Sequence, residues 1–401
     1  MLCLSCSYAL CLAAQMDVVI GSSKARYVAG EPVFITVKFL NTGATPFAII
    51  VPSSDACTSE TIIGVEGLRR SDRSPCSDQG DSLVFTCYNG PGPQRVDIEP
   101  HGAYEMRLLL NRTYDLRQPG KYRTHVHVHL QYADVPVRAP GYIDKTRDDR
   151  NDLTIELVEG DVDALRAAFG PVLADLDRQD FRPQWYAQAG VLLALAPRFA
   201  ESRILAWTDR QDLEVMPALR KLGTKAAIEK LEAIAFEDPD GNQQREWLRQ
   251  AALEQIRYIN EKSLLPKLLA ITAQNRVQMI RWNAASAAAR IGHGEAVPAI
   301  GRMLADPDRF ITFAGAEALG DTASPDAVGV LISAIPSAKD ANTFSAIVEA
   351  LARLTHRTTA PDFSDRMAVY RRWNEWWTAH RGSADIYGPD SCGAATPLNR
   401  E

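Results

Sequence analysis

The sequence contains few of the residue types that carry most enzyme chemistry, with 7 histidines and 7 cysteines among 401 residues. It has no GxSxG, SxxK or HExxH motif and no glycine-rich phosphate loop. Those motifs are typical of serine hydrolases, zinc peptidases and phosphate-binding enzymes. We therefore expect a non-enzymatic protein that has no cofactor and no evident small-molecule substrate.

A basic excess is also lacking, because 44 Lys and Arg face 50 Asp and Glu for a formal net charge of -6. Nucleic-acid-binding proteins normally concentrate positive charge against phosphates. The balance predicts no nucleic-acid partner, and a helical array that holds nucleic acid through helix N-termini and arginines is the alternative. The length favours two domains rather than one core.

One uncharged apolar run, "MLCLSCSYALCLAA", occupies residues 1–14. It is too short to span a bilayer and has the length of a signal-peptide core, so we predict cleavage after Ala13 or Ala14. The alternative is a buried first strand. The run predicts export to the periplasm or the cell exterior, and no membrane span.

Three cysteines beyond the leader, Cys57, Cys76 and Cys87, lie in or beside a segment rich in Ser, Asp and Gly. In an exported protein this clustering predicts one disulfide and a spare thiol, with the pairing left open. Their spacings do not match a zinc knuckle, so a metal site is the weaker alternative.

Residues 16–158 alternate between apolar and polar side chains. Val33, Ile35, Val37 and Phe39 would share one buried face of a strand. Similar runs separated by Gly, Pro, Asn and Asp predict an antiparallel β-sandwich. The charged run "DKTRDDRND", residues 144–152, is predicted to be a solvated loop before the last strand. The stretches "YVAGEPVFITVKFLNTG" and "QPGKYRTHVHVHL" resemble immunoglobulin-like domains of exported bacterial proteins, which concerns the fold only.

The segment "HVHVH" places His125, His127 and His129 on one face of a strand. Histidines two residues apart on a strand can share a zinc ion if another ligand completes the site. The competing interpretation is a solvated face opposite a buried one made of Val126, Val128 and Leu130. We favour the solvated face, because the alternation continues through Arg123 and Gln131 without a break and no HExxH or second HxH motif is present.

Residues 160–380 change to a helical period and repeat themselves. "LRQAALEQIRYINEKSLLPKLLAI", "IRWNAASAAARIGHGEAVPAIGRML" and "ADPDRFITFAGAEALGDTASPDAVGVLI" each read as two short helices, with a period near 32 residues. That pattern predicts an α-solenoid. Ser324 would cap the helix opened by Pro325, and Gly292 and Gly320 would supply left-handed helix ends.

The third of these stretches resembles HEAT repeats of the phycobilin-lyase-like type, over residues 245–356 with fainter copies back to 185. The resemblance implies a scaffold, inhibitor or regulator, and in a few members a bilin-attaching enzyme. Second helices usually line the inner face of such an array. Lys267, Arg302 and Ser333 are therefore our predicted binding residues for a protein partner.

The segment "RWNEWW" places Trp373, Trp376 and Trp377 on one helix face. We interpret it as a cap on the last repeat, with ligand binding as the alternative. Residues 381–401 are expected to be a polar tail.

Together these patterns predict a multidomain β + α protein, an exported scaffold that binds a protein partner through its HEAT-type half. The alternative is an enzyme-like module, either similar to a bilin lyase or a zinc-dependent hydrolase that uses residues 125–129.

Overall fold

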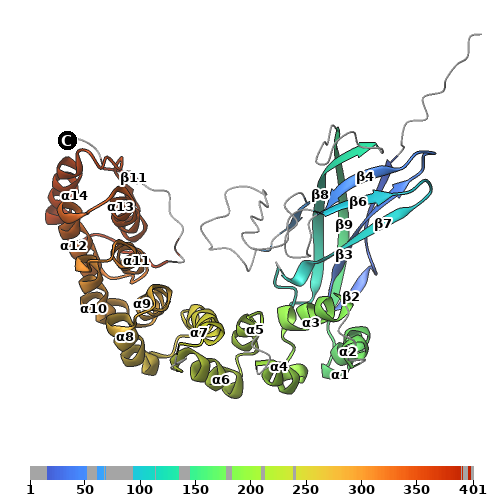
Figure 1. Ribbon diagram of the computed structural model, residues 1–401, viewed down its shortest axis with the longest axis horizontal. Coiled ribbons are helices and arrows are strands. Elements are labelled where there is room, and N and C mark those ends of the chain that lie inside the picture. Colours follow the sequence, from blue (N-terminus) through green and yellow to red (C-terminus); the bar gives the residue numbers. More distant parts are fainter. Residues whose placement is uncertain are drawn as a thin grey trace, which may run out of the picture. The chain divides into compact units, whose positions relative to one another are not determined.

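The computed structural model divides into two compact units, Met1–Leu195 and Ala196–Glu401 (Figure 1). It describes residues 16–51, 61–66, 68, 94–112, 114–134, 145–177, 183–208, 213–237, 241–389, 391 and 396–398. The predicted signal peptide and Cys57, Cys76 and Cys87 lie outside the described residues.

The first unit is β-rich, as the alternating pattern predicted. Its strands are β1 (Met16–Ser22), β2 (Arg26–Val28), β3 (Phe34–Asn41), β4 (Phe47–Val51), β5 (Thr61–Val65), β6 (Gln94–Ile98), β7 (Ala103–Leu109), β8 (Gly120–Asp134) and β9 (Lys145–Val158). One sheet has the order β1-β3-β7, and the other has the order β2-β9-β8-β4-β6, with β5 also paired to β8. Among the described pairs of this unit, β2 and β9 run parallel and the others run antiparallel.

Buried side chains from both sheets form one apolar cluster. Val33, Ile35, Val37 and Phe39 are at most 1% exposed, as the alternation along this stretch requires. Val126 and Val128 of β8 face the same cluster. The burial of these side chains therefore fixes which face of β8 carries its histidines.

The predicted loop at residues 144–152 is wrong, because Lys145–Val158 is one continuous strand paired with β8. His125 stands opposite Asp152, and His129 stands opposite Asp148. Oppositely charged side chains on neighbouring strands attract each other, so a charged run can be a strand when its partner strand carries histidines.

A buried asparagine ties the end of β7 to the start of β3. Asn111 lies in the short helical turn η2 (Leu110–Arg112) and is 8% exposed. Its Oδ1 accepts a hydrogen bond from the Val33 amide at 2.7 Å, and its Nδ2 donates to the Glu31 carbonyl at 3.0 Å. Both ends of the amide are used, as a buried polar group requires.

The switch from strand to helix falls where the sequence period changes. Asp161 caps α1 (Val162–Ala168) by accepting a hydrogen bond from the Ala164 amide at 2.7 Å. Two further helices, α2 (Gly170–Asp177) and α3 (Pro183–Leu195), follow. The first compact unit includes all three helices, because α1 packs on β2 and α3 packs on η2. The sequence pattern had placed the domain change earlier, near residue 160.

The second unit is helical. Its α-helices are α4 (Glu201–Trp207), α5 (Val215–Leu222), α6 (Lys225–Phe236), α7 (Gln243–Ile256), α8 (Leu265–Gln274), α9 (Gln278–Gly292), α10 (Val297–Gly301), α11 (Arg309–Gly320), α12 (Pro325–Ala334), α13 (Ala341–Thr355) and α14 (Arg366–His380). Helices α5, α7, α9, α11 and α13 contact one another in series, and we call them the first layer (Figure 1). Helices α8, α10, α12 and α14 do the same and form the second layer.

Small side chains let these helices approach closely. The alanines of α9 at positions 284, 285, 287, 288 and 289 are fully buried. Ser324 accepts a hydrogen bond from the Asp326 amide, and Pro325 opens α12, as predicted.

The predicted left-handed helix ends at Gly292 and Gly320 are wrong, because neither residue has a positive φ. Both glycines are needed for space instead. An added Cβ at Gly292 would lie 2.7 Å from a Leu265 methyl carbon, and one at Gly320 would lie 3.0 Å from the Ala350 Cβ.

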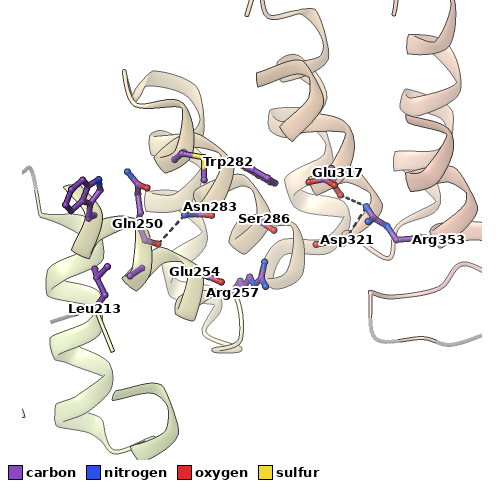
Figure 2. A pocket seen from close by; sticks show the side chains of 13 residues that line it. Leu213, Gln250, Glu254, Arg257, Trp282, Asn283, Ser286, Glu317, Asp321 and Arg353 are labelled. Atoms are coloured by element: carbon purple, nitrogen blue, oxygen red, sulfur yellow. Dashed lines mark hydrogen bonds and ion pairs between the residues drawn. The ribbon is translucent and has the colours of Figure 1, made fainter. Parts of the chain in front are cut away.

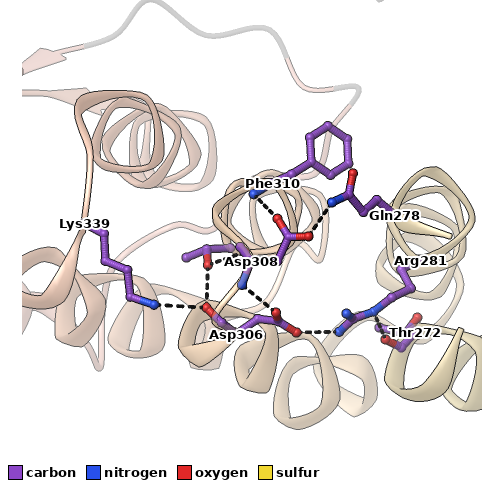
Figure 3. Close-up of polar contacts among 8 residues, drawn as sticks. Thr272, Gln278, Arg281, Asp306, Asp308, Phe310 and Lys339 are labelled. Atoms are coloured by element: carbon purple, nitrogen blue, oxygen red, sulfur yellow. Dashed lines mark hydrogen bonds and ion pairs between the residues drawn. The ribbon is translucent and has the colours of Figure 1, made fainter. Parts of the chain in front are cut away.

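The Asp-Pro-Asp turn between α10 and α11 joins successive helix pairs (Figure 3). The Asp306 carboxylate accepts from Arg281 Nη2 at 2.9 Å, and Arg281 Nε donates to the Thr272 carbonyl at 3.0 Å. The Asp306 carbonyl accepts from Lys339 Nζ at 3.3 Å. Asp308 caps α11 by accepting from the Phe310 amide at 2.9 Å, and this bond helps to hold the pKa of its carboxyl below the ordinary value. The turn thus links residues of three consecutive helix pairs.

The end of the helical unit is covered by aromatic side chains. Trp373 of α14 is fully buried, and α14 packs on α12, as the cap interpretation expects. Part of the predicted polar tail, residues 381–401, packs back on the end of α13. Tyr387 stacks on His356 with ring centres 3.6 Å apart, and its amide donates to the Leu354 carbonyl at 2.9 Å.

Candidate functional site

A hollow of about 690 Å³ opens on the first layer of the helical unit (Figure 2). Its lining comes from α7, α9, α11 and α13, with Leu213 just before α5. The lining residues are Leu213, Trp247, Gln250, Ala251, Glu254, Arg257, Met279, Trp282, Asn283, Ser286, Glu317, Asp321 and Arg353. Residues at equivalent positions of successive first-layer helices line the hollow, so it runs along the direction in which the repeats stack.

One end of the hollow is apolar. Leu213, Trp247 and Met279 are 46%, 51% and 38% exposed, although large apolar side chains are usually covered in a folded protein. Trp282 is half-buried, and its ring meets the Phe310 ring edge-on at 5.4 Å. This end therefore combines a packed aromatic pair with three large apolar side chains that are exposed to solvent.

The opposite end is polar and largely self-paired. Arg353 donates to the Glu317 carbonyl at 3.0 Å and lies 3.9 Å from the Asp321 carboxylate. Burial raises the pKa of the Glu317 carboxyl, and the nearby Arg353 works against that rise. Figure 2 shows this group at the far side of the hollow from Leu213.

The structure does not bring the predicted binding residues Lys267, Arg302 and Ser333 to this hollow. They belong to α8, to the short turn η7 (Arg302–Ala305) and to α12, on the side of the second layer. All three are exposed. Lys267 Nζ lies 5.1 Å from the centre of the Phe236 ring, and the Ser333 hydroxyl donates to the Gly329 carbonyl at 2.8 Å. Their role in binding stays a prediction.

The three histidines of β8 point to solvent, and each meets a carboxylate. His125 lies 2.7 Å from Asp152 and 3.0 Å from Glu66. His127 and His129 share Asp148, at 2.8 and 3.0 Å. Within the described part of the chain, no group of three or more His, Cys, Asp or Glu side chains is suited to hold a metal ion.

These contacts shift several pKa values. The hydrogen bonds to Asp152 and then to Glu66 raise the pKa of His125. The hydrogen bond to His125 lowers the pKa of Asp152, and those to His129 and His127 lower the pKa of Asp148.

Sequence reasoning missed the residues of the hollow. The sequence did contain a signal, namely a large apolar residue at the same position of two consecutive repeats. Trp247 and Met279 lie on the first helix of consecutive helix pairs, and both are exposed. That signal was hidden, since apolar residues on a repeat helix are normally assigned to the core.

No helix among the described residues is long and apolar enough to cross a bilayer. The comparison with curated proteins found no match.

Two solved structures are similar in part. Aminopeptidase A of Legionella pneumophila, in complex with aspartic acid, has 11% identity and a TM-score of 0.31, over 84% of this chain and 40% of that one. The native conformation of E. coli alpha-2-macroglobulin has 9% identity and a TM-score of 0.21, over 84% of this chain and 25% of that one. This chain thus spans less than half of either structure.

The family comparison concerns the helical unit, where residues 242–320 match the model of HEAT repeats. HEAT repeats are commonly protein-interaction modules. The matched segment covers α7 to α11, which supply most of the hollow. The C-terminal half of this protein therefore contains HEAT-type repeats.

Proposed function

We propose that this protein is an exported, non-enzymatic scaffold that binds a protein partner in the hollow of its helical unit. In this proposal the helical unit is a HEAT-type solenoid, and the β-rich unit is an immunoglobulin-like sandwich that carries one disulfide. The observation that supports binding most directly is the exposure of Leu213, Trp247 and Met279 within one hollow.

Exposed apolar side chains gathered in a concave surface are a common feature of protein-binding sites. Tryptophan in particular is enriched among the few residues that dominate binding energy. Polar side chains, Gln250 and Asn283 among them, line the same hollow, so a partner would find hydrogen-bonding groups beside the exposed apolar side chains.

The test is capture with the full chain as bait in an envelope extract of the source organism. Trp247→Ala with Met279→Ala should reduce the bound partner by tenfold or more, since loss of a central aromatic anchor typically costs about 2 kcal/mol or more. The matched control replaces Lys267, Arg302 and Ser333 by Ala on the second layer and should leave capture unchanged.

Equal capture by the Trp247 and Met279 variant would contradict the placement of the site. Loss of capture in the control variant would instead support the second-layer prediction made from the sequence.

A further inference from the structure

Three arginines surround one tyrosine beside the hollow. The guanidinium carbons of Arg220, Arg257 and Arg290 lie 5.1, 4.7 and 5.3 Å from the centre of the Tyr258 ring. Arg257 Nη2 also donates to the Tyr258 hydroxyl at 2.5 Å. The arginines come from α5, from the residue that follows α7, and from α9, so the first layer assembles this cluster from successive helices.

The positive charge of the cluster is only partly matched. Arg220 Nε donates to the neutral Gln255 side chain at 2.9 Å. Among the described residues, no carboxylate lies within ion-pair distance of Arg220 or Arg257, and Arg257 Nε is buried without a hydrogen-bond partner. Burial lowers the pKa of Arg220, Tyr258 opposes that shift, and the neighbouring Arg257 adds to it. A bound anion would offset the repulsion between the two guanidinium groups.

Helix-end electrostatics account for part of this arrangement. Each arginine stands in or just after the last turn of its helix, where a cation is favoured, and the Tyr258 ring attracts cations. Neither effect supplies an acceptor for Arg257 Nε, and a guanidinium pairs best with a carboxylate or phosphate in a two-pronged geometry.

We infer that Arg220, Arg257, Arg290 and Tyr258 bind the carboxylate of an acidic residue in an extended peptide segment of the partner. This inference rests on the proposed function, because Arg257 also lines the hollow. Trp247, Gln250, Glu254 and Arg257 follow one another at i, i+3, i+7 and i+10, along one side of α7. A rise of 1.5 Å per residue puts Trp247 about 15 Å from Arg257. An extended chain covers that span in about four or five residues.

The acidic side chains of the hollow set the direction of such a peptide. Glu254 lies between the two ends, and Glu317 and Asp321 occupy the far side. Glu317 and Asp321 would disfavour a peptide carboxylate on the far side, where Arg353 already contacts Asp321 and the Glu317 carbonyl. The recognised motif should therefore have one apolar side chain for Trp247 and Met279 and one acidic residue about four or five positions away.

The experiment is selection from a random displayed peptide library on the immobilised full chain, repeated on an Arg257→Gln, Arg290→Gln variant. Selected peptides should share an apolar residue and an acidic residue at that separation, and the variant should lose the acidic preference alone. For one selected peptide, replacing its Glu or Asp by the amide should weaken binding about tenfold, equivalent to about 1.4 kcal/mol. The same replacement should have little effect on the variant, because the two changes remove one interaction.

Arg371→Gln, at an exposed cation of α14 in the second layer, is the matched control and should bind as the unmodified chain does. Competition by inorganic phosphate separates a general oxyanion site from one that requires the peptide. Unchanged thermal unfolding shows that the variant is folded, and Arg257→Lys, which keeps the charge, gives a second comparison.

Peptides that share only the apolar residue would overturn the anion site and leave the proposed function standing. An acidic preference that survives in the variant would place the anion elsewhere and also overturn the inference. No selected peptide at all would count against both.

Discussion

The two units differ in whether their most noticeable surface side chains have partners within the chain. The comparison is between the exposed face of β8 and β9 and the first layer of the helical unit. On the strands, His125, His127 and His129 all meet carboxylates of Asp148, Asp152 or Glu66. On the helices, Trp247 and Met279 stay uncovered. A sequence motif that resembles a site is thus paired within the chain, whereas two residues that resemble core residues remain exposed.

The difference follows from how each region buries its surface. A strand pairs with two neighbours, so the polar side chains on its outer face find partners directly across the ladder. A helical repeat contacts only its neighbours in the array, and its outward positions remain open wherever no third layer covers them. Binding is therefore expected on the helical unit, and the β-rich unit is expected to respond mainly through stability.

The largest effect should come from the end cap of the helical unit. Trp373→Ala removes a fully buried indole of α14, a helix that packs on α12, and should cost about 3–5 kcal/mol of unfolding free energy. Urea unfolding followed by amide hydrogen exchange would show the loss concentrated in α12 to α14. Arg371→Ala, an exposed neighbour on the same helix, should change stability by less than about 0.5 kcal/mol. Equal loss of protection throughout the unit would show that the cap does not act locally.

A smaller effect is expected in the β-rich unit. Asn111→Ala leaves the Val33 amide and the Glu31 carbonyl without partners inside the fold, and this should cost about 1–3 kcal/mol. The same urea titration measures it, with exposed Gln118→Ala as the control. A change no larger than that of the control would mean that water replaces the lost hydrogen bonds.

The smallest effect concerns pH and the exposed histidine face. The folded pKa of His125 lies above its ordinary value of 6.5, so its contribution is complete below that value and disappears as pH rises through the folded pKa. The folded pKa values of Asp148 and Asp152 lie below 3.8, so their contributions are lost as pH falls through those lowered values. The cluster should therefore stabilise the fold most between these limits.

His125→Gln should lower Tm at about pH 5.5 and have almost no effect at about pH 8.5, where the imidazole is neutral. The decrease should be small, because the ion pairs are exposed. Thermal unfolding of both chains at the two pH values measures this. His101→Gln is a control, because this exposed histidine lies outside the cluster. A larger effect at the higher pH would contradict the assigned direction.

Most of the β-rich unit could be predicted where alternation is strict, as in Val33 to Phe39. The error at residues 144–152 arose because strand propensity is a matter of context, and nothing within that charged run reveals that a histidine-bearing strand lies beside it. The parallel pairing of β2 with β9 joins segments far apart in the chain and has no local signal.

The helical unit was more predictable, since the same pattern of helices and turns recurs in several repeats of its sequence. Caps such as Ser324 are set by chemistry within a few residues. The candidate site was not predictable in the same way. Lys267, Arg302 and Ser333 were chosen from the usual arrangement of such arrays, whereas the hollow opens on the helices of the other layer.

The sequence by itself determined the change from strands to paired helices near residue 160, the repeat and its caps, because these depend on side-chain periodicity and contacts within one turn. Only the tertiary structure decided that Gly292 and Gly320 provide space rather than turns. It also decided that the histidines of β8 meet carboxylates of β9, and that Arg220, Arg257 and Arg290 gather on Tyr258. Each of these depends on which distant segments lie against each other, and that is settled by the packing of whole elements.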